Sequence, residues 1–569
     1  MFPGVIRKLV LVLGALAGLA AFVGCPPTQE ATIYSSAIEQ LEQFINEELE
    51  RGLIPGLSIA LVDDQEIVWA QGFGLADRED WVAADAQTIY RVGSISKLFT
   101  DMGVMQLVEA GSIDLDADIT TYYPDFSIGR PFETETPTTL RQLMSHTSGF
   151  PREPPVGSYF DDTEPTVRET VESIFDTELV YPPETRTKYS NIAVTVVGYI
   201  LELVSGEPFV QYQREHLLEP MGLTSSDFLA TPEIREHLAT GYMWVADGRN
   251  IAAPLFELGT LPAGNLYSTV EDMGCFLSFI FAEGRAGDNQ ILESETLERM
   301  FQAQFSTEEH PRRFGLGYVL GEFRGHRAVG HTGAVFGFTS AVTALPDAKI
   351  GVVVLVNEDI ATGPLYRIRN RALELMLEAK LGEAPPEPPQ FVEVDSSIWE
   401  DYAGEYESHM YWAEINSEDG RLILNLSGQP MELLPLSETE YFARGKLVEG
   451  AQVTFVRGED GIATEFRYND MGFARVDPDQ IPTPPSHWQG YVGSYGQEFI
   501  PAVVSIRHGH LYVFVENEFD YRLTPVSETL FDMPSSGMYQ DQQFEFRLDE
   551  EGNVESIVMA YVEFEPIDN

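Results

Sequence analysis

Cysteine and lysine are scarce in this chain of 569 residues. The two cysteines, Cys25 and Cys275, are too few for a disulfide framework, and Cys275 lies in an apolar helical pattern where we expect a buried thiol without a chemical role. Basic residues number 35 against 90 acidic ones, and the net charge is −55. Such a chain does not bind nucleic acid or anionic lipid by charge. The acid excess fits a saline habitat or a solubilising surface equally well.

Metal-ligand and phosphate-loop spacings are also missing, so the sequence predicts no metal and no cofactor. The N-terminal hydrophobic run, residues 9–23, follows Arg7 and Lys8 and is shorter than the roughly twenty residues of a membrane-spanning helix. It predicts an export signal over residues 1–25, followed by a tether at 26–31.

The end of that signal, Phe22-Val23-Gly24-Cys25, resembles a bacterial lipoprotein cleavage box. The resemblance implies cleavage before Cys25 and acylation of its sulfur, which would anchor an exported protein to the periplasmic or cell-surface side of a membrane by lipid alone. A plain signal peptide and an uncleaved anchor remain alternatives. All three place the protein outside the cytoplasm.

A chain of this length exceeds a single core, so we expect several domains. Residues 32–382 alternate helical and strand-like segments. Strands are expected at 57–63, 67–72, 341–345 and 351–356, with helices at 37–53 and 365–381. Strands at both ends with helices between them predict an α+β fold whose sheet is built from both termini.

Two proline-rich linkers, 383–392 and 478–486, divide the remainder into related pieces, 393–477 and 487–569. The segment Trp399–Tyr406 of the first piece matches Trp488–Tyr495 of the second. Both pieces carry short alternating strands separated by Asp-Gly or Glu-Gly turns. We therefore predict two tandem antiparallel β-barrels, and neither contains an evident nucleophile with a base.

The segment Gly93-Ser94-Ile95-Ser96-Lys97 precedes a helix that is apolar on nearly every side and runs to Gly111. Ser94 and Lys97 are three residues apart and share one helix face. An all-round apolar helix is a buried one, and its first N–H groups have no intrahelical partners. A hydroxyl, a proton acceptor and free donors are what a nucleophilic site needs. A single Ser-x-x-Lys match is nevertheless unsurprising by chance in a chain of this length.

Two later motifs make the match specific. Tyr189-Ser190-Asn191 enters an apolar helix, and Gly330-His331-Thr332-Gly333-Ala334 enters a strand-like run. In this order the three motifs resemble those of the serine β-lactamase and penicillin-binding-protein superfamily, and the tyrosine is similar to the class C branch with its esterase and D-aminopeptidase relatives. Further stretches resemble the same family: Ile54–Ser58, Leu143–Phe150, Ala263–Asp272 and Phe314–Tyr318.

The resemblance covers residues 32–380. It implies a β-lactamase-like fold, with an antiparallel sheet flanked by helices and a helical lobe, and an active site in the groove between them. It implies that Ser94 is the nucleophile and that Lys97 takes its proton or holds Tyr189 as a phenolate. Tyr189 would protonate the leaving group and activate the deacylating water. Asn191 would form hydrogen bonds with Lys97 and with the substrate amide. The N–H groups of Ser94 and Ala334 would donate to the oxyanion. His331, Thr332 and Gly333 would lie on the strand next to the substrate.

His331 departs from the β-lactamase pattern, which has lysine at this position. A histidine is mostly neutral at pH 7 and offers no permanent charge to a substrate carboxylate, which favours peptidases and esterases over penicillin hydrolysis. A packed structural histidine is the alternative for His331. We expect Lys188 to be a solvated residue beside the motif, with assistance to the reaction as the alternative, and His146 to be a turn and packing residue.

These observations predict an exported serine hydrolase acting through an acyl-enzyme on a small molecule or short peptide. A D-amino-acid peptidase or amidase leads, with a small-ester esterase next; a true β-lactamase and a penicillin-recognising sensor without turnover are the alternatives. The tandem barrels resemble the architecture of some D-aminopeptidases. A further alternative is that the barrels dock a partner or other copies in a homo-oligomer.

Overall fold

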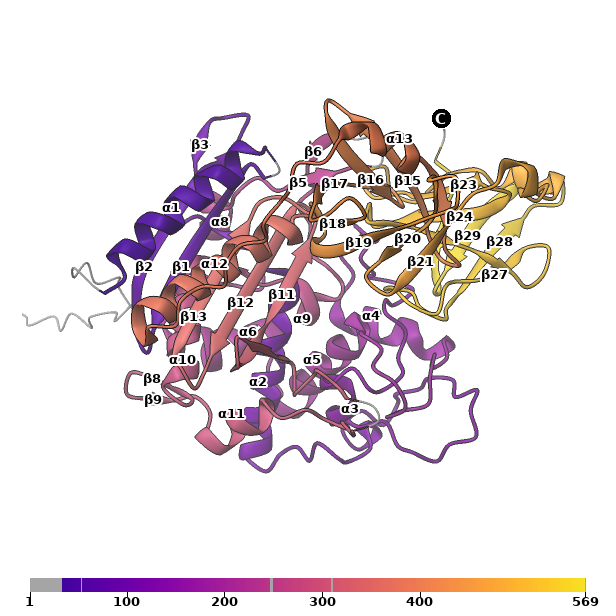
Figure 1. Cartoon of the computed structure of the whole chain (residues 1–569). Coiled ribbons are helices and arrows are strands. Elements are labelled where there is room, and N and C mark those ends of the chain that lie inside the picture. The colour runs from indigo at the N-terminus through magenta and orange to yellow at the C-terminus, as the bar shows by residue number, and fades with distance from the viewer. Residues whose placement is uncertain (1–32, 53, 246–248, 309–310, 568–569) are drawn as a thin grey trace, which may run out of the picture.

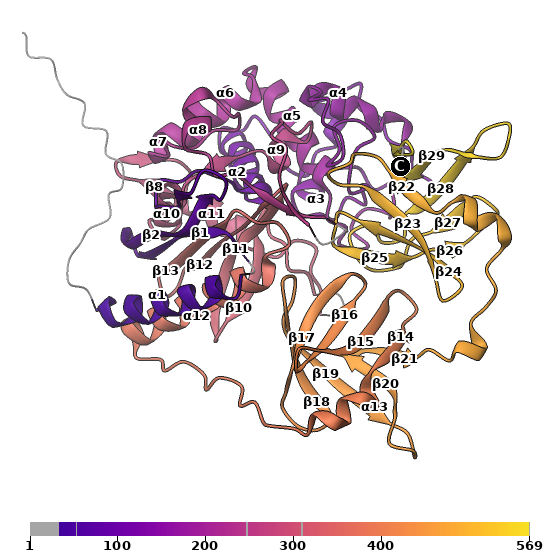
Figure 2. The same ribbon diagram turned by 90° about the horizontal axis from the view of Figure 1, so that it is seen from above.

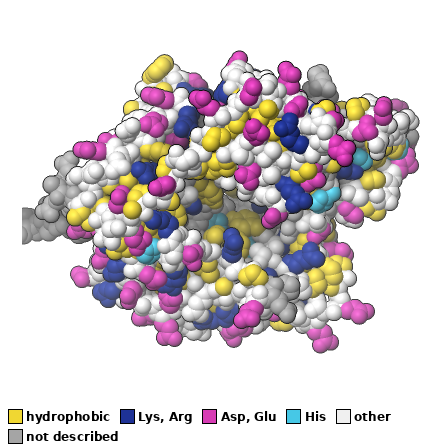
Figure 3. Space-filling model, in the orientation of Figure 1, with side chains coloured by type: hydrophobic (Ala, Val, Ile, Leu, Met, Phe, Trp, Pro, Cys, Tyr) yellow, Lys and Arg dark blue, Asp and Glu magenta, His cyan; other side chains and the backbone are white. Residues whose placement is uncertain are grey.

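The computed structural model describes residues 33–52, 54–245, 249–308 and 311–567. The predicted signal, the acylation site Cys25 and the tether lie outside these residues. Within the described ranges no single helix is long and apolar enough to cross a membrane, although the bent pair Asn191–Ser205 and Phe209–Met221 has the required length and composition when taken together. Acidic side chains are spread over the face seen in Figure 3, where basic ones are fewer.

The first part of the chain is organised on a seven-stranded sheet with the order β10-β11-β12-β13-β1-β2-β3. Its strands are β1 Gly56–Asp63, β2 Glu66–Asp77, β3 Val82–Ala83, β10 Val319–Phe323, β11 His326–Val335, β12 Phe338–Leu345 and β13 Ile350–Val356. The first strand pairs antiparallel with the last, with Leu57 opposite Val356. The predicted α+β sheet built from both ends of the unit is confirmed.

Alternation along β13 separates the two faces of this sheet. Val353 and Leu355 pack into the core that contains α2 and α10, whereas Val352 and Val354 pack into a second core under α1 and α12. The α1 and α12 ribbons lie together over one face in Figure 1. Because both faces are covered, β13 is buried along its whole length, which explains its unbroken apolar sequence.

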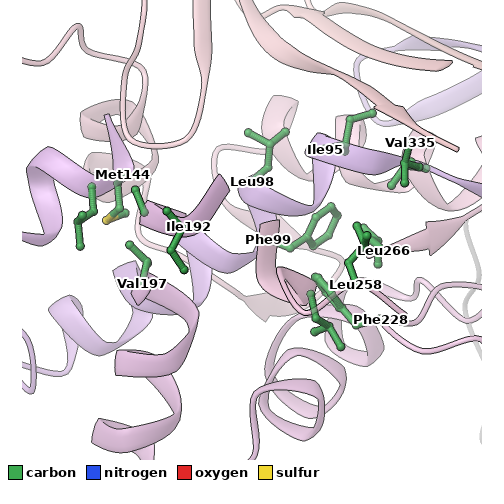
Figure 4. Close-up of a cluster of buried hydrophobic side chains, with 14 of the residues drawn as sticks. Ile95, Leu98, Phe99, Met144, Ile192, Val197, Phe228, Leu258, Leu266 and Val335 are labelled. Carbon is green, nitrogen blue, oxygen red and sulfur yellow. The ribbon is translucent and has the colours of Figure 1, made fainter. Parts of the chain in front are cut away.

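The rest of this unit consists of helices joined by loops and short strands. The helices are α1 Ser35–Glu50, α2 Ser96–Glu109, α3 Leu140–Met144, α4 Val167–Glu172, α5 Asn191–Ser205, α6 Phe209–Gln213, α7 Glu219–Met221, α8 Pro232–His237, α9 Leu261–Gly264, α10 Val270–Phe281, α11 Ser294–Met300 and α12 Thr362–Leu381. The buried helix α2 packs against α5 and α9. Figure 4 shows Leu98 and Phe99 of α2 among side chains from several other segments, including Ile192 of α5 and Leu266. A rigid apolar support therefore carries the residues at the start of α2.

The first C-terminal repeat is the predicted closed barrel. After the short helix α13 Trp399–Tyr402, its strands are β14 Gly404–Glu407, β15 Trp412–Glu418, β16 Arg421–Leu426, β17 Gln429–Pro435, β18 Glu440–Gly445, β19 Glu449–Arg457, β20 Ala463–Tyr468 and β21 Met471–Arg475. Closure is completed by pairing of β14 with β21. The barrel has its own core and meets the first unit of the chain, residues 33–382, at α12 and at an ion pair of 2.5 Å between Lys446 and Glu358.

The second repeat differs from the predicted closed barrel. Its strands form one sheet of four and another of five: β22 Gly493–Tyr495, β23 Ala502–Arg507, β24 His510–Val515 and β25 Phe519–Arg522, then β26 Thr524–Pro525, β27 Leu530–Asp532, β28 Gln543–Leu548, β29 Val554–Met559 and β30 Val562–Phe564. Its hydrophobic residues belong to the same core cluster as the helical lobe. Phe160 of that lobe packs 4.9 Å from Phe564, between ring centroids. A repeat that shares its core with a neighbour does not need to close on itself.

The two repeats remain recognisably related. Tyr406 donates a hydrogen bond of 2.7 Å to the carbonyl oxygen of Tyr402, and Tyr495 donates one of 2.8 Å to that of Tyr491. These are the tyrosines of the two matched segments. In Figure 2 the two repeats lie side by side along one flank of the first unit. The sequence match therefore reflects a shared local structure even though the sheets are joined differently.

Candidate active site

Ser94 lies in a 3-10 turn, Gly93–Ile95, that leads directly into α2. The turn is locked against β11. Gly93 has φ +53°, and a Cβ atom there would lie 2.9 Å from the nitrogen of Ala334. A Cβ on Gly333 would lie 2.0 Å from the carbonyl oxygen of Val92 and 3.0 Å from the nitrogen of Ser94. Both positions need glycine, and their close approach brings the N–H groups of Ser94 and Ala334 to the same place.

Lys97 occupies the first turn of α2, where the i, i+3 spacing places it over Ser94. Its Nζ donates hydrogen bonds to Ser94 Oγ at 3.0 Å and to the carbonyl oxygen of Ala263 at 2.7 Å. The residue is 1% exposed. Burial, followed by the nearby Arg152 charge, lowers the pKa of Lys97 to about 7. Its neutral amine is therefore well populated near neutral pH.

Tyr189 completes a triangle with these two residues. Lys97 Nζ lies 5.0 Å from the centroid of its ring. Burial raises the pKa of Tyr189 to about 12, although its hydrogen bond with Ser94 and the charge of Arg152 act in the opposite direction. The ring is therefore a neutral phenol near pH 7. Of the two proton acceptors that the sequence left open, the surroundings favour the Lys97 amine over a Tyr189 phenolate.

Tyr189 is held by the start of α5. Ser190 caps this helix by accepting a hydrogen bond of 3.0 Å from the nitrogen of Ala193, and its hydroxyl donates one of 2.6 Å to the carbonyl oxygen of Pro151. The His146 ring packs 4.2 Å from the Tyr189 ring, between centroids, and His146 Nδ1 accepts a hydrogen bond from the nitrogen of Ser190. His146 has φ +56°, in keeping with the predicted turn. This histidine orients the tyrosine by packing.

Asn191 does not bond its predicted protein partner, Lys97. Its Nδ2 donates a hydrogen bond of 2.5 Å to Glu153 Oε1, whereas the hydrogen bonds of Lys97 go to Ser94 and Ala263. Glu153 is fully buried and needs such donors. Burial raises the pKa of Glu153 to about 7 despite the opposing charge of Arg152.

His331 lies on β11 with 5% of its surface exposed. Its Nδ1 is 2.5 Å from the carbonyl oxygen of Thr332, and its Nε2 has no hydrogen-bond partner in the part of the chain that the structure describes. Burial and then the Lys97 charge lower the pKa of His331 to about 4. The ring is therefore neutral and lies 6.2 Å from that of Tyr189, between centroids.

The prediction of a solvated Lys188 is wrong. Lys188 is 1% exposed, and its Nζ donates to the carbonyl oxygens of Met538 at 3.3 Å and Gln540 at 3.1 Å. Both acceptors belong to the second repeat, which covers this side of the site. Lys188, which the local sequence suggested to be solvated, is therefore buried in the interface between the first unit and the second repeat.

The same docking creates a feature that sequence reasoning missed. A cavity of about 410 Å³ opens beside Tyr189, with one wall from the catalytic unit and the other from the C-terminal repeats. The lining includes Arg152, Lys188 and Tyr189 on one side and Tyr411, Glu518, Phe519, Tyr521, Met538 and Gln540 on the other. The local sequence offered one signal, the paired carboxylates of Glu516-Asn517-Glu518 at a strand end. Their arrival beside Tyr189 depends on contacts across more than 300 residues of chain.

Some charged side chains around this cavity are paired and one, Glu518, is not. Arg152 bonds Glu516 Oε2 at 3.4 Å, and Glu516 also accepts a hydrogen bond from the Tyr539 hydroxyl. Glu518 lines the cavity without a hydrogen-bonded or ion-paired side-chain partner among the described residues. Burial and then the charge of Glu516 raise the pKa of Glu518 to about 7. The charge of Arg152 acts in the opposite direction on Glu518, and this arginine is also paired with Glu153 and Glu516. The cavity therefore presents a carboxyl group without a hydrogen-bonded side-chain partner in the described part of the chain.

Three groups that can bind a metal come together elsewhere, among the described residues: Glu207, Glu215 and His216. They lie towards the far end of α2, where Gln106 donates to the carbonyl oxygen of His216. The cluster is apart from Ser94, and the candidate active site itself is formed from serine, lysine and tyrosine.

A family model described as Beta-lactamase matches residues 41–375, more than half of the chain. The chain belongs to the β-lactamase family. A second model, described only as a domain of unknown function (DUF3471), matches residues 388–479, which contain the closed barrel.

Known proteins extend this result. Beta-lactamase-like protein 2 of Dictyostelium discoideum is 32% identical over an alignment that covers 46% of this chain. The same alignment covers 48%, about half, of that protein. The octameric penicillin-binding protein homologue from Pyrococcus abyssi is 27% identical, with a TM-score of 0.57 over 77% of this chain and 100% of its own. The D-amino acid amidase from Ochrobactrum anthropi SV3 shares the fold at 23% identity, with a TM-score of 0.52 over 60% of this chain and 99% of its own. This β-lactamase-family fold therefore continues into a C-terminal all-β region.

Proposed function

We propose that this chain is a serine hydrolase that forms an acyl-enzyme on Ser94 and cleaves amides or short peptides carrying a free amino group. The observation that carries the proposal is the buried Lys97 amine bonded to Ser94 Oγ beside a neutral phenol. A group with a pKa near the working pH is an efficient general base, and the pKa of Lys97 is about 7.

Acylation begins when the Lys97 amine takes the proton of Ser94 and Oγ attacks the substrate carbonyl. The N–H groups of Ser94 and Ala334 hold the resulting oxyanion, and each such donor typically contributes about 3–4 kcal/mol to the transition state. The C–N bond then breaks, and Tyr189 passes a proton to the departing amine while Lys97 returns its proton to Tyr189. In deacylation water gives one proton to this pair, attacks the ester and regenerates the Ser94 hydroxyl.

The substrate class follows from the charges around the cavity. An ammonium group entering beside Tyr189 meets Glu518, whose carboxyl group has no side-chain partner in the described part of the chain. A substrate carboxylate meets a neutral His331 and an Arg152 already paired with Glu516. A free amino group is therefore favoured over the carboxylate of a penicillin. Because a D-amino acid amidase shares this fold, we place amides of D-amino acids first.

An esterase acting on small esters is the second candidate. The aromatic and apolar lining from Tyr411, Phe519, Tyr521 and Met538 favours it, because these side chains accept an uncharged acyl group. The chemistry at Ser94 is the same for an ester, and only the leaving group differs.

The test uses the purified protein and its Ser94→Ala variant. Substrates are p-nitroanilides of D- and L-alanine, their N-acetylated forms, p-nitrophenyl butyrate and nitrocefin, with intact mass following acylation. We expect turnover of a free-amine anilide that exceeds that of its acetylated form, and an adduct that is absent from Ser94→Ala. Absence of both turnover and adduct would contradict the hydrolase proposal. A preference for nitrocefin would show that the protein hydrolyses β-lactams rather than amides with a free amino group.

Export and assembly are further proposals. Export through residues 1–25 with acylation at Cys25 predicts incorporation of labelled palmitate that Cys25→Ser abolishes; label in both forms would contradict it. We also propose assembly of copies through the C-terminal repeats, supported by the octameric state of the Pyrococcus relative. A monomeric mass by sedimentation would contradict assembly.

A further inference from the structure

The closed barrel contacts the turn of the second repeat that forms part of the cavity wall, and the proposed reaction does not use this contact. The turn joins β24 to β25 and contains Glu516, Asn517 and Glu518. Glu516 pairs with Arg152, and Glu518 lines the cavity. The barrel therefore contacts the segment on which the proposed substrate class depends.

Gln429, at the start of β17 in the barrel, makes this contact. Its Nε2 donates hydrogen bonds of 3.1 Å to the carbonyl oxygen of Asn517 and of 2.7 Å to that of Glu518. Gln429 is 4% exposed and Asn517 is 0% exposed, so the contact is largely shielded from water. Buried carbonyl oxygens need donors, and loss of the Gln429 amide would therefore favour another position of the turn.

The backbone of this turn is of a kind that needs support from outside. Glu516 has φ +53° and Asn517 has φ +55°. Positive φ is more unusual for glutamate than for asparagine, and such conformations persist where the surrounding structure holds them. Within the turn, the nitrogen of Glu518 donates a hydrogen bond of 3.0 Å to the carbonyl oxygen of Val515. Gln429 adds the bonds from outside, on the two residues that follow Glu516.

Further contacts from the barrel reach β25, the strand that follows the turn. Trp412 Nε1 donates a hydrogen bond of 2.8 Å to Asp520 Oδ2, and both side chains are buried. The Tyr411 ring lies 5.8 Å from that of Phe519, between centroids, and both residues line the cavity. The barrel therefore contacts the hairpin at its turn and on the next strand, so it can fix the turn relative to the cavity.

We propose that the closed barrel determines substrate specificity through Gln429, a positioning residue that holds the turn so that the Glu518 carboxyl group faces the cavity. Gln429 is not among the residues that line the cavity, and it acts through the two carbonyl oxygens that it bonds. The barrel, which matches a domain of unknown function, then helps to select substrates with a free amino group. The effect on substrate rests on the proposed function, whereas the position of the turn can be measured without any substrate.

Gln429→Met tests this role, because methionine keeps the length of the side chain and removes both donor N–H groups; Gln429→Leu repeats the test with a second apolar side chain. His508→Asn is the matched control. His508 of the second repeat bonds Glu405 and Glu407 of the barrel at 3.0 and 3.1 Å, at the opposite end of β24 from the turn. Hydrogen exchange by mass spectrometry, in a peptide that contains Glu518, reports the turn without substrate. Kinetics with the free-amine anilide, its acetylated form and p-nitrophenyl butyrate report specificity, and include Glu518→Gln and the double variant with Gln429→Met.

We expect faster exchange in this peptide for both Gln429 variants and wild-type exchange for His508→Asn. KM for the free-amine anilide rises about tenfold in the Gln429 variants, the order expected for loss of one or two neutral hydrogen bonds, whereas kcat stays within about twofold. Values for the two substrates without a free amine stay within about twofold of wild type. Because Gln429 acts through Glu518, the double variant is no worse than Glu518→Gln alone.

The outcomes separate two failures. Unchanged exchange in both Gln429 variants would overturn the role of Gln429, whatever the substrate. Equal losses on all three substrates, or additive losses in the double variant, would mean that Gln429 only supports packing between the repeats, and this too would overturn its role. A wild type that turns over none of the substrates, or that prefers the acetylated anilide, would overturn the proposed function; faster exchange in the Gln429 variants would then still show that the barrel holds the turn.

Discussion

Substitution of Glu518 by glutamine tests the substrate class most directly. Glutamine keeps the size of the side chain and its capacity to accept a hydrogen bond, but it removes the charge. We expect kcat/KM for an anilide with a free amino group to fall, while the values for the N-acetylated anilide and for p-nitrophenyl butyrate stay within about twofold of wild type. Uncharged substrates do not depend on a carboxylate in the cavity wall.

The size of the fall follows from the site. Unit charges about 4 Å apart at an effective dielectric constant of about 20 attract by about 4 kcal/mol. Glu518 has a pKa of about 7, so about half of the molecules carry the charge at neutral pH, and the cavity is open to solvent. A net loss of about 2 kcal/mol, or about 30-fold in kcat/KM, is the expected result.

The pH dependence gives a second readout. The pKa of Glu518 is raised to about 7, so the carboxylate is lost as the pH falls through about 7 and becomes the main form above it. Wild-type preference for the free-amine anilide over its acetylated form therefore rises from pH 6 to pH 7.5, then falls once the substrate amine, with a pKa of about 7.7–8.0, loses its proton. In Glu518→Gln the rising part disappears. Equal losses on charged and acetylated substrates, with an unchanged preference profile, would refute this account of the cavity.

Three further predictions concern other parts of the molecule. Truncation after residue 486 uncovers Phe160 and the other lobe residues that share a core with the second repeat. At about 2 kcal/mol per large side chain, the lost free energy of unfolding approaches the whole stability of a domain, so we expect aggregation. A monodisperse truncated protein with an unchanged melting temperature would contradict this expectation. His331→Lys adds a permanent cation beside Tyr189 and should speed acylation by nitrocefin about tenfold; no change would mean that this ring does not face the substrate carboxylate. Tyr189→Phe should slow deacylation by about 10²-fold or more while the Ser94 adduct is still detected by mass, and unchanged turnover would remove the phenol from the mechanism.

The parts of the site that sequence predicted are those set by local geometry. The spacing of Ser94 and Lys97 is a helical one, and the structure places Lys97 Nζ 3.0 Å from Ser94 Oγ. The sheet from both ends of the unit followed from the apolar runs of β1 and β13, which pair directly. In each case the pattern within a few residues already contained the physical reason for the contact.

The failures share a different cause. Lys188 is polar and next to a motif, and nothing within its own segment shows that the carbonyl oxygens of Met538 and Gln540 cover it. The second repeat was predicted to be a barrel because its sequence matches the first and carries similar short strands, yet it forms two separate sheets where its core merges with the helical lobe. Asn191 turns to Glu153 because that carboxyl group is buried beside it. All three depend on which surfaces dock, and docking is not encoded by local periodicity.

The proposed reaction and the proposed substrate class rest on different parts of the chain, the first unit and the second repeat. Lys97 obtains its lowered pKa from burial in α2 and from Arg152, both within the catalytic unit, so the chemistry at Ser94 is set there. Glu516 pairs with that same arginine from the second repeat, and Glu518, two positions further along the chain, faces the cavity. Docking of the repeat therefore adds Glu516 beside an arginine that already faces Glu153, and in the proposed function it also adds the carboxyl group that would attract a substrate amine. The contact between Arg152 and Glu516 is one of the links between this cavity and the second repeat.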